Sequence, residues 1–239
     1  DIWTRMGAFE AKIPLPHILG LDVAGVVAEA ASPSTGLTAG QEVIIAPGLS
    51  CGRCYYCHSG QDTLCPTYQL LGFQVDGGYA EYVKAPEENL IVKPKSMTFE
   101  EAAASPIVYQ TSWHGLVRKA SIRPGEDVLI WGAASGLGLA ALQVAKLLGA
   151  RVIAVVGSDA KAEKVKELGA DKIVNRLKAN VVDEVKRLTQ GKGVDIVFDH
   201  VGEATWGYEH PESIERWKDG LLWSHIRQIC PSEYTLPIS

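Results

Sequence analysis

The chain has 239 residues, of which 46% are hydrophobic and 21% charged, and its formal net charge is -5. This composition is typical of a globular protein with one or two domains. The negative charge argues against nucleic-acid binding, which uses clustered Lys and Arg to neutralise phosphates. No apolar run approaches the roughly 20 residues that span a bilayer, and the N-terminus shows no signal-peptide pattern. We expect a cytoplasmic protein that acts on a small molecule, without a nucleic-acid or membrane partner.

Residues 1–97 are rich in Gly and Pro and contain short apolar runs, such as those at 23–27 and 42–45. Short runs bounded by turn-forming residues indicate small antiparallel strands. We therefore predict an all-β domain over residues 1–97.

The pattern changes at residue 98, after which a helix is predicted to open at residues 100–104 and apolar runs alternate with helical spacing. Buried strands are predicted at 128–130, 152–156, 172–174 and 195–198. Helices are predicted at 137–148, 160–168 and 181–189. Strands that alternate with helices in this way indicate a doubly wound α/β domain, which we assign to residues 98–206.

Four cysteines follow a C-x2-C-x2-C-x7-C pattern, namely Cys51, Cys54, Cys57 and Cys65. This spacing can place four thiolates around one zinc ion, and a closed shell of four thiolates leaves no open position for catalysis. Two disulfides are an alternative that requires an oxidising compartment. An iron–sulfur cluster is another, although ferredoxins place three residues, not seven, before the last cysteine. We predict one structural Zn²⁺.

A turn of small residues follows the strand at 128–130 and leads into a helix, where a pyrophosphate can bind the helix N-terminus. The strict G-x-G-x-x-G pattern is absent, because two of its glycine positions hold Ala133 and Ser135. Close packing of the helix on the strand is the alternative role of such a turn. The predicted cofactor-binding residues here are Gly132, Ala133, Ser135, Gly136, Leu137 and Gly138.

The strand at 152–156 ends in Gly157 and Ser158, without the Asp or Glu that binds the ribose 2'-hydroxyl in NAD sites. Ser158 can donate a hydrogen bond to a 2'-phosphate, and Lys161 can supply positive charge. The alternative is a solvated loop with an ordinary surface lysine. We therefore favour NADP(H) over NAD(H).

Several segments together resemble the medium-chain dehydrogenase/reductase family of zinc alcohol dehydrogenases and quinone oxidoreductases. They lie in order over residues 1–206: the segment 16–25, the four-cysteine loop, 77–82, Thr111, the turn 132–138 and 199–202. The resemblance implies a GroES-like β domain, N-terminally incomplete, followed by a Rossmann domain that is C-terminally incomplete. It also implies that the cysteine loop is a structural zinc lobe, that Val201 contacts the cofactor and that the complete protein is a homo-oligomer.

Two positions depart from the family members that use a catalytic zinc. Leu21, between Gly20 and Asp22, stands where those members have a histidine ligand, and Ile107 stands where a cysteine ligand is expected. We therefore expect no catalytic zinc, and a hydride transfer between NADP(H) and a small carbonyl, enone or quinone. The alternatives are an alcohol dehydrogenase with an unconventional catalytic metal site and a nucleotide-binding sensor without catalysis.

Candidates for catalysis are Tyr109, Thr111 and Asp22, with His17 and His114 as further possible donors to a developing oxyanion. By resemblance, Thr111 contacts the nicotinamide side of the cofactor. The alternatives are structural: Tyr109 packs at the domain junction, Thr111 packs in its helix, and Asp22 braces the β domain.

Residues 207–239 form an atypical tail with neither helical nor strand periodicity. One hypothesis is a frameshift, because codons chosen for residues 221–225 encode Ile-Val-Val-Thr when read two bases along. In that case the tail has no evolved function, and we expect this polypeptide to have little or no activity.

Overall fold

The structure is a computed structural model that describes residues 1–7, 13, 15–30, 36–202 and 205. The predicted tail at 207–239 lies outside the described residues. The chain divides into two compact units, Asp1–Ile107 and Val108–Ser239, each described separately below. The sequence placed this boundary at residue 97. None of the helices in the described part of the chain has the length and apolar character needed to cross a membrane.

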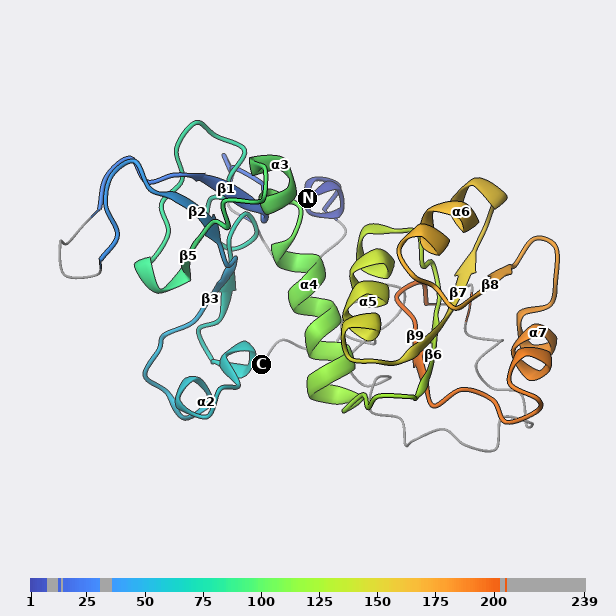
Figure 1. Ribbon diagram of the computed structural model, residues 1–239. Helices are drawn as coiled ribbons and strands as arrows, with labels where there is room; N and C mark the ends of the chain where they lie inside the picture. Colours follow the sequence, from blue (N-terminus) through green and yellow to red (C-terminus); the bar gives the residue numbers. More distant parts are fainter. Residues whose placement is uncertain (8–12, 14, 31–35, 203–204, 206–239) are drawn as a thin grey trace. The chain divides into compact units, whose positions relative to one another are not determined.

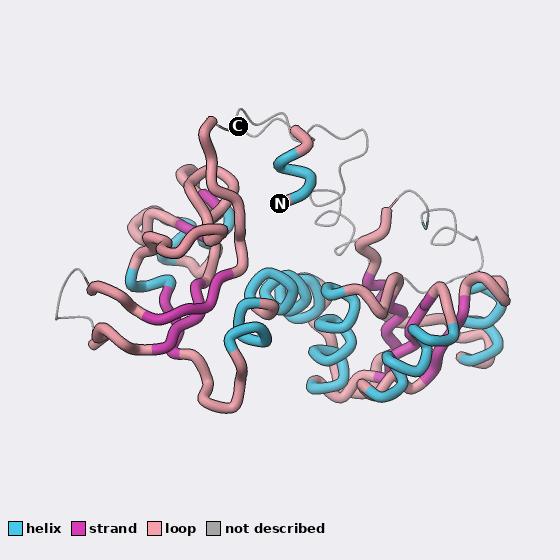
Figure 2. Tube along the Cα trace, turned by 90° about the horizontal axis from the view of Figure 1, so that it is seen from above, coloured by secondary structure: helices cyan, strands magenta, loops and turns pink. Residues whose placement is uncertain are grey.

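The first unit contains a three-stranded antiparallel sheet with the order β1-β2-β5. Its strands are β1 (Val23–Val26), β2 (Glu42–Ile45) and β5 (Leu90–Val92). Three consecutive residues of the central strand β2 are buried, whereas each edge strand exposes apolar side chains. The two strands predicted here, 23–27 and 42–45, end within one residue of β1 and β2. Figure 2 shows these strands as short segments joined by long loops.

A smaller lobe of the first unit carries the four cysteines. It contains a two-stranded sheet of β3 (Gly48–Leu49) and β4 (Gln69–Leu70), the helical turn α2 (Tyr55–His58) and the 3-10 turn η2 (Asp62–Leu64). The other short elements of the unit are α1 (Ile2–Arg5), the 3-10 turn η3 (Glu87–Asn89) and α3 (Phe99–Ala103).

The helix predicted to open at residues 100–104 is α3, which begins with a capping box. The backbone N–H of Glu101 donates to the Thr98 hydroxyl, and the Glu101 carboxylate accepts from the Thr98 N–H. These reciprocal bonds satisfy donors that a helix start leaves free. The next helix, α4 (Pro106–Trp113), starts with a proline, as is common at first helical positions, and continues into the π-helical turn η4 (His114–Lys119).

The second unit is built on a four-stranded parallel sheet with the order β8-β7-β6-β9 (Figure 1). The strands are β6 (Asp127–Ile130), β7 (Arg151–Val156), β8 (Lys172–Asn175) and β9 (Ile196–Phe198). The helices between them are α5 (Gly136–Leu147), α6 (Asp159–Glu167) and α7 (Val181–Leu188). Every one of these elements begins and ends within one residue of its predicted bounds.

Helices cover both faces of this sheet. On β6, Val128 and Ile130 face a core that contains α5 and α6, whereas Leu129 belongs to a second core that contains α7. A strand buried on both faces is a continuous apolar run, which is why these strands were recognisable in the sequence. The chain runs from β6 outward to β8 and then returns to the opposite side of β6 for β9. The doubly wound prediction is thereby confirmed.

Candidate functional site

The four cysteines converge in the lobe of the first unit. Their sulfur atoms all lie within 4.8 Å of one another, with 3.4 Å between Cys54 and Cys57 and 3.9 Å between Cys51 and Cys57. A disulfide bond is about 2.05 Å long, and all four cysteines are free thiols. Four sulfurs at about 2.3 Å from one zinc ion lie about 3.8 Å apart in a tetrahedron. The geometry of the lobe therefore fits a zinc site with four cysteine ligands and no ligand position left for substrate.

Hydrogen bonds in the lobe shift the pKa values of these thiols in different directions. The Thr67 hydroxyl and the backbone N–H of Cys51 hydrogen-bond to the sulfur of Cys65 and lower its pKa to about 6. At Cys54 a backbone hydrogen bond from Cys57 lowers the pKa, but burial and hydrogen bonds with the other thiols raise it to about 11. A bound zinc ion would displace the remaining protons, because zinc binds the thiolate form.

In the second unit, the turn between β6 and α5 carries most of the predicted cofactor residues. Gly132 has a positive φ of 55°, and Ser135 is the N-cap of α5, its hydroxyl accepting from the N–H of Gly138 at 3.1 Å. A Cβ at Gly138 would collide with the carbonyl oxygen of Gly132. Glycine here lets the helix pack directly on the turn, which is one of the glycine roles in dinucleotide-binding motifs.

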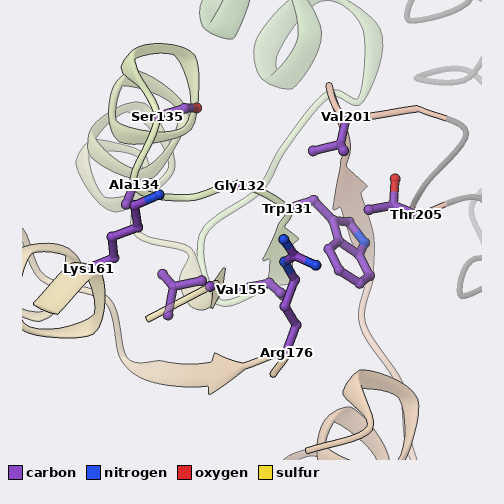
Figure 3. Close-up of a pocket in the computed structure, with 11 residues that line it drawn as sticks. Trp131, Gly132, Ala134, Ser135, Val155, Lys161, Arg176, Val201 and Thr205 are labelled. Carbon is purple, nitrogen blue, oxygen red and sulfur yellow. The ribbon is translucent and has the colours of Figure 1, made fainter. Parts of the chain in front are cut away.

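A pocket of about 280 Å³ opens at the carboxyl edge of the sheet, above this turn (Figure 3). It lies at the carboxyl end of β6, which has β7 on one side and β9 on the other. This is the switch point at which open α/β sheets bind ligands. Its lining residues are Trp131, Gly132, Ala134, Ser135, Val155, Val156, Gly157, Lys161, Arg176, Val201 and Thr205.

The pocket has two cationic residues, and none of the described residues that line it is acidic. Lys161 comes from the first turn of α6, and Arg176 directly follows β8. Neither side chain forms an ion pair within the described part of the chain. A Cβ added at Gly157 would lie 3.7 Å from Nε and Nη2 of Arg176. The side chain of Arg176 therefore extends along the backbone of Gly157, at the end of β7.

Only some of the predicted cofactor residues of the second unit line this pocket. Gly132, Ser135, Lys161 and Val201 line it. Ala133 is fully buried behind the turn, and Gly136, Leu137 and Gly138 belong to the first turn of α5. Ser158 is not among the lining residues; its hydroxyl caps α6 by accepting from the N–H of Lys161 at 3.4 Å.

The sequence interpretation did not include Arg176. Its nearest signal was its position just after a predicted strand, but that signal depends on which strand lies beside it. The register of β7 and β8 pairs Val156 with Asn175, so that the following residues, Gly157 and Arg176, are neighbours. The other lining residues that were not predicted are Trp131, Ala134, Val155, Val156, Gly157 and Thr205.

A polar pair connects the turn to the end of β9. The Nε2 atom of His200 lies 2.8 Å from the hydroxyl oxygen of Ser135. Burial lowers the pKa of His200, and the negative charge of Asp199 opposes this effect. Asp199 itself accepts a hydrogen bond from the Thr205 hydroxyl and another from the N–H of Val201, at 2.6 Å. The loop after β9 is thus held in place beside the pocket.

None of the three catalytic candidates is among the residues that line this pocket. Tyr109 and Thr111 are on α4, and neither lines the pocket. Asp22 accepts from the N–H of Ile107, in the first turn of α4, at 2.9 Å. Partial burial raises the pKa of Asp22, and this hydrogen bond lowers it. A carboxylate at a helix start has a structural role of its own, so the catalytic assignments of these residues remain predictions.

Of the two histidine candidates, His17 has a buried side chain whose Nδ1 lies 3.3 Å from Asp76, and His114 is the first residue of η4. The segment around Leu21 is held by backbone hydrogen bonds from the second family-like segment. The N–H of Gly78 donates to the carbonyl of Gly20, at 2.9 Å. Two segments that carry the family resemblance are therefore packed together, although 58 residues separate Gly20 from Gly78.

A parallel sheet with a pocket and a helix N-terminus at its switch point defines a Rossmann-type nucleotide-binding domain, and here it follows a β domain with a four-cysteine lobe. Two family models match the chain: a model described as an alcohol dehydrogenase GroES-like domain over residues 1–95, and one described as a zinc-binding dehydrogenase over residues 136–208. The chain belongs to the medium-chain dehydrogenase/reductase family, as its motifs indicated.

Individual relatives agree with this assignment. The chain is 36% identical to an NAD-dependent alcohol dehydrogenase from Sulfurisphaera tokodaii, over 83% of this chain and 59% of the relative. It is 50% identical to a crystal structure of an NAD-dependent alcohol dehydrogenase, with a TM-score of 0.82, over 86% of this chain and 60% of the other. A quinone oxidoreductase from Pseudomonas syringae is 33% identical, with a TM-score of 0.68, over 86% and 55%. The chain thus spans about three fifths of the length of the first two relatives.

Proposed function

We propose that the protein is an NADP(H)-dependent oxidoreductase that transfers a hydride between the nicotinamide and a small carbonyl, enone or quinone. A single structural zinc ion occupies its four-cysteine lobe. The observation that carries this proposal is the pair of cations that line the pocket, Lys161 and Arg176, with Arg176 directly beside Gly157.

This pair favours the phosphorylated cofactor for an electrostatic reason. In NAD sites a carboxylate near the end of the second strand binds the ribose hydroxyls, and it would repel a 2'-phosphate. Here that strand ends in Val155, Val156 and Gly157, and Arg176 presents a planar guanidinium that can bind phosphate through two parallel hydrogen bonds. Because Arg176 has no ionic partner among the described residues, it is available to a ligand.

The relatives named above are described as NAD-dependent, and the cofactor preference proposed here differs from theirs. The difference is testable on one residue. We expect wild-type protein to bind NADPH more tightly than NADH, as measured by fluorescence titration. Replacing Arg176 by Ala removes a charge-assisted contact worth about 1.5–3 kcal/mol, which corresponds to a roughly 10- to 150-fold loss of NADPH affinity. The affinity for NADH should change less than about twofold.

The matched control is Arg123→Ala, which removes the same charge from an exposed position outside the pocket. It should leave both affinities unchanged. Tighter binding of NADH than of NADPH by the wild-type protein would refute the proposed cofactor preference.

The proposed class of hydride acceptor rests on Leu21 and Ile107, which stand where zinc-dependent family members have metal ligands. Without metal ligands at these positions, we favour an acceptor that is already electron-poor, such as an enone or quinone. A second candidate function, alcohol oxidation with an unconventional catalytic metal, is favoured by the names of the relatives. Zinc content separates the two: about one zinc ion per chain supports the reductase, and about two support the alcohol dehydrogenase.

A further inference from the structure

The contact between His200 and Ser135 joins two segments that lie 65 residues apart in the sequence. Ser135 lines the pocket from the turn before α5, and His200 follows β9 on the neighbouring strand. The imidazole is fitted closely against the turn, because a Cβ at Gly132 would lie only 3.2 Å from Nε2 of His200. A ring held this close to the turn can control the orientation of the Ser135 hydroxyl.

A serine hydroxyl has one proton to donate and two lone pairs to accept with. One lone pair of Ser135 already accepts the N–H of Gly138, at 3.1 Å. If Nε2 of His200 accepts, the proton of the hydroxyl is used in that bond and none remains for a ligand. If Nε2 donates, it fills the second lone pair, and the hydroxyl proton is free to point into the pocket.

The surroundings of the other ring nitrogen, Nδ1, do not determine whether Nε2 donates or accepts. Nδ1 of His200 is buried and has no hydrogen-bond partner among the described residues. The hydrogen bonds of the loop hold Asp199 rather than the imidazole, so both tautomers of the ring are open to it. An anion in the pocket shifts this balance, because only the form with a proton on Nε2 leaves the Ser135 proton for a phosphate oxygen.

We propose that His200 is a positioning residue of the cofactor site. By donating from Nε2 to the Ser135 hydroxyl, it turns the serine proton toward the pyrophosphate of a bound dinucleotide. This inference rests on the proposed function in placing a pyrophosphate at the N-terminus of α5. It does not depend on the 2'-phosphate, so it applies to NADP and NAD alike.

The direct test uses wild-type protein labelled with ¹⁵N in its six histidines. The nitrogen signals of His200 are assigned by their absence in His200→Gln. On saturation with NADP⁺, we expect the Nε2 signal to move to the chemical-shift range of a protonated ring nitrogen. An Nε2 that remains an unprotonated acceptor in the saturated complex would overturn the proposal.

A second test compares two substitutions. His200→Phe keeps a ring but cannot donate, whereas the amide of His200→Gln can donate to Ser135. We expect NADP⁺ to bind about tenfold more weakly to the Phe variant, because nothing then holds the Ser135 hydroxyl with its proton toward the phosphate and that charge-assisted hydrogen bond is weakened, and within about threefold of wild type to the Gln variant. Equal affinities of wild type and the Phe variant would contradict the inference.

Adenosine 2'-monophosphate separates this failure from a failure of the proposed function. It carries the 2'-phosphate but no pyrophosphate, so both His200 variants should bind it as wild type does. This result also shows that the variants are folded. If wild type does not bind it and prefers NADH to NADPH, the proposed cofactor preference fails, and NAD⁺ then serves as the probe for His200.

Discussion

The guanidinium group of Arg176 lies beside the backbone of Gly157, with Nε and Nη2 each 3.7 Å from the point that a Cβ of residue 157 would occupy. The two residues follow adjacent positions of the paired strands β7 and β8. A side chain placed at residue 157 would therefore contact Arg176 directly. The residue at position 157 therefore determines whether the positive charge of Arg176 stays unpaired at the edge of the pocket.

The first prediction is that Gly157→Asp shifts cofactor preference toward NADH. A carboxylate at this position would pair with Arg176 and repel a 2'-phosphate, while it could accept hydrogen bonds from the ribose hydroxyls of NADH. We expect the ratio of NADPH affinity to NADH affinity to fall at least about tenfold. Gly157→Asn is the control of equal size without the charge, and an equal effect of both substitutions would show that space, and not charge, decides the preference.

The second prediction concerns two glycines at the start of α5. A Cβ at Gly138 would collide with the carbonyl of Gly132, whereas a Cβ at Gly136 meets only Val108, at an ordinary 3.7 Å. Gly138→Ala should therefore destabilise the protein by about 1–3 kcal/mol through overpacking and weaken dinucleotide binding. Gly136→Ala should leave stability unchanged or slightly higher, because alanine is the better helix former. Urea unfolding of both variants is the measurement, and equal stabilities would contradict the prediction.

The third prediction concerns the metal lobe. Cys65→Ser removes one of four thiolate ligands, so we expect zinc content measured by atomic emission to fall from about one ion per chain to a small fraction. Loss of the metal should also lower the melting temperature, because zinc binding stabilises the folded lobe. Tyr55→Phe alters an exposed side chain of the same lobe and should retain the metal. Full zinc occupancy in the Cys65 variant would show that the four thiols do not form one site.

The fourth prediction links pH to stability through Asp171. Burial raises the pKa of this carboxyl, but its hydrogen bonds with the Lys146 ammonium, at 2.7 Å, and with the N–H of Val152 lower it below its ordinary value. A group with a lowered folded-state pKa stabilises the protein above its unfolded pKa, about 3.9, and loses this contribution as the pH falls through the folded value.

Asp171→Asn should therefore cost about 1 kcal/mol at neutral pH, and the difference from wild type should shrink as the pH falls below about 4. Urea unfolding of both proteins between pH 7 and pH 3 measures this difference. A constant difference across the range would mean that the charge of Asp171 contributes nothing to stability.

The sequence by itself predicted the strands and helices from β6 to β9 and the grouping of the four cysteines. Strands such as Arg151–Val156 are buried on both faces, so their apolar runs are continuous and their ends are visible in the sequence. The four cysteines are separated by two, two and seven residues, and such short spacings restrict where the sulfurs can lie. Local patterns were sufficient wherever the controlling interactions were local.

Only the tertiary structure revealed the neighbours of Arg176 and His200. Arg176 is 15 residues from Lys161 in the sequence, and it reaches the same pocket because β8 pairs with β7 in a particular register. His200 meets Ser135 because the chain crosses the sheet to place β9 beside β6. Ser158 was predicted as a phosphate ligand from its place after the strand, and the structure adds that its hydroxyl also caps α6 by accepting the N–H of Lys161. Strand order and register bring together side chains that are distant in the chain. Local sequence patterns do not specify this order or register, so these contacts were not predictable from the sequence.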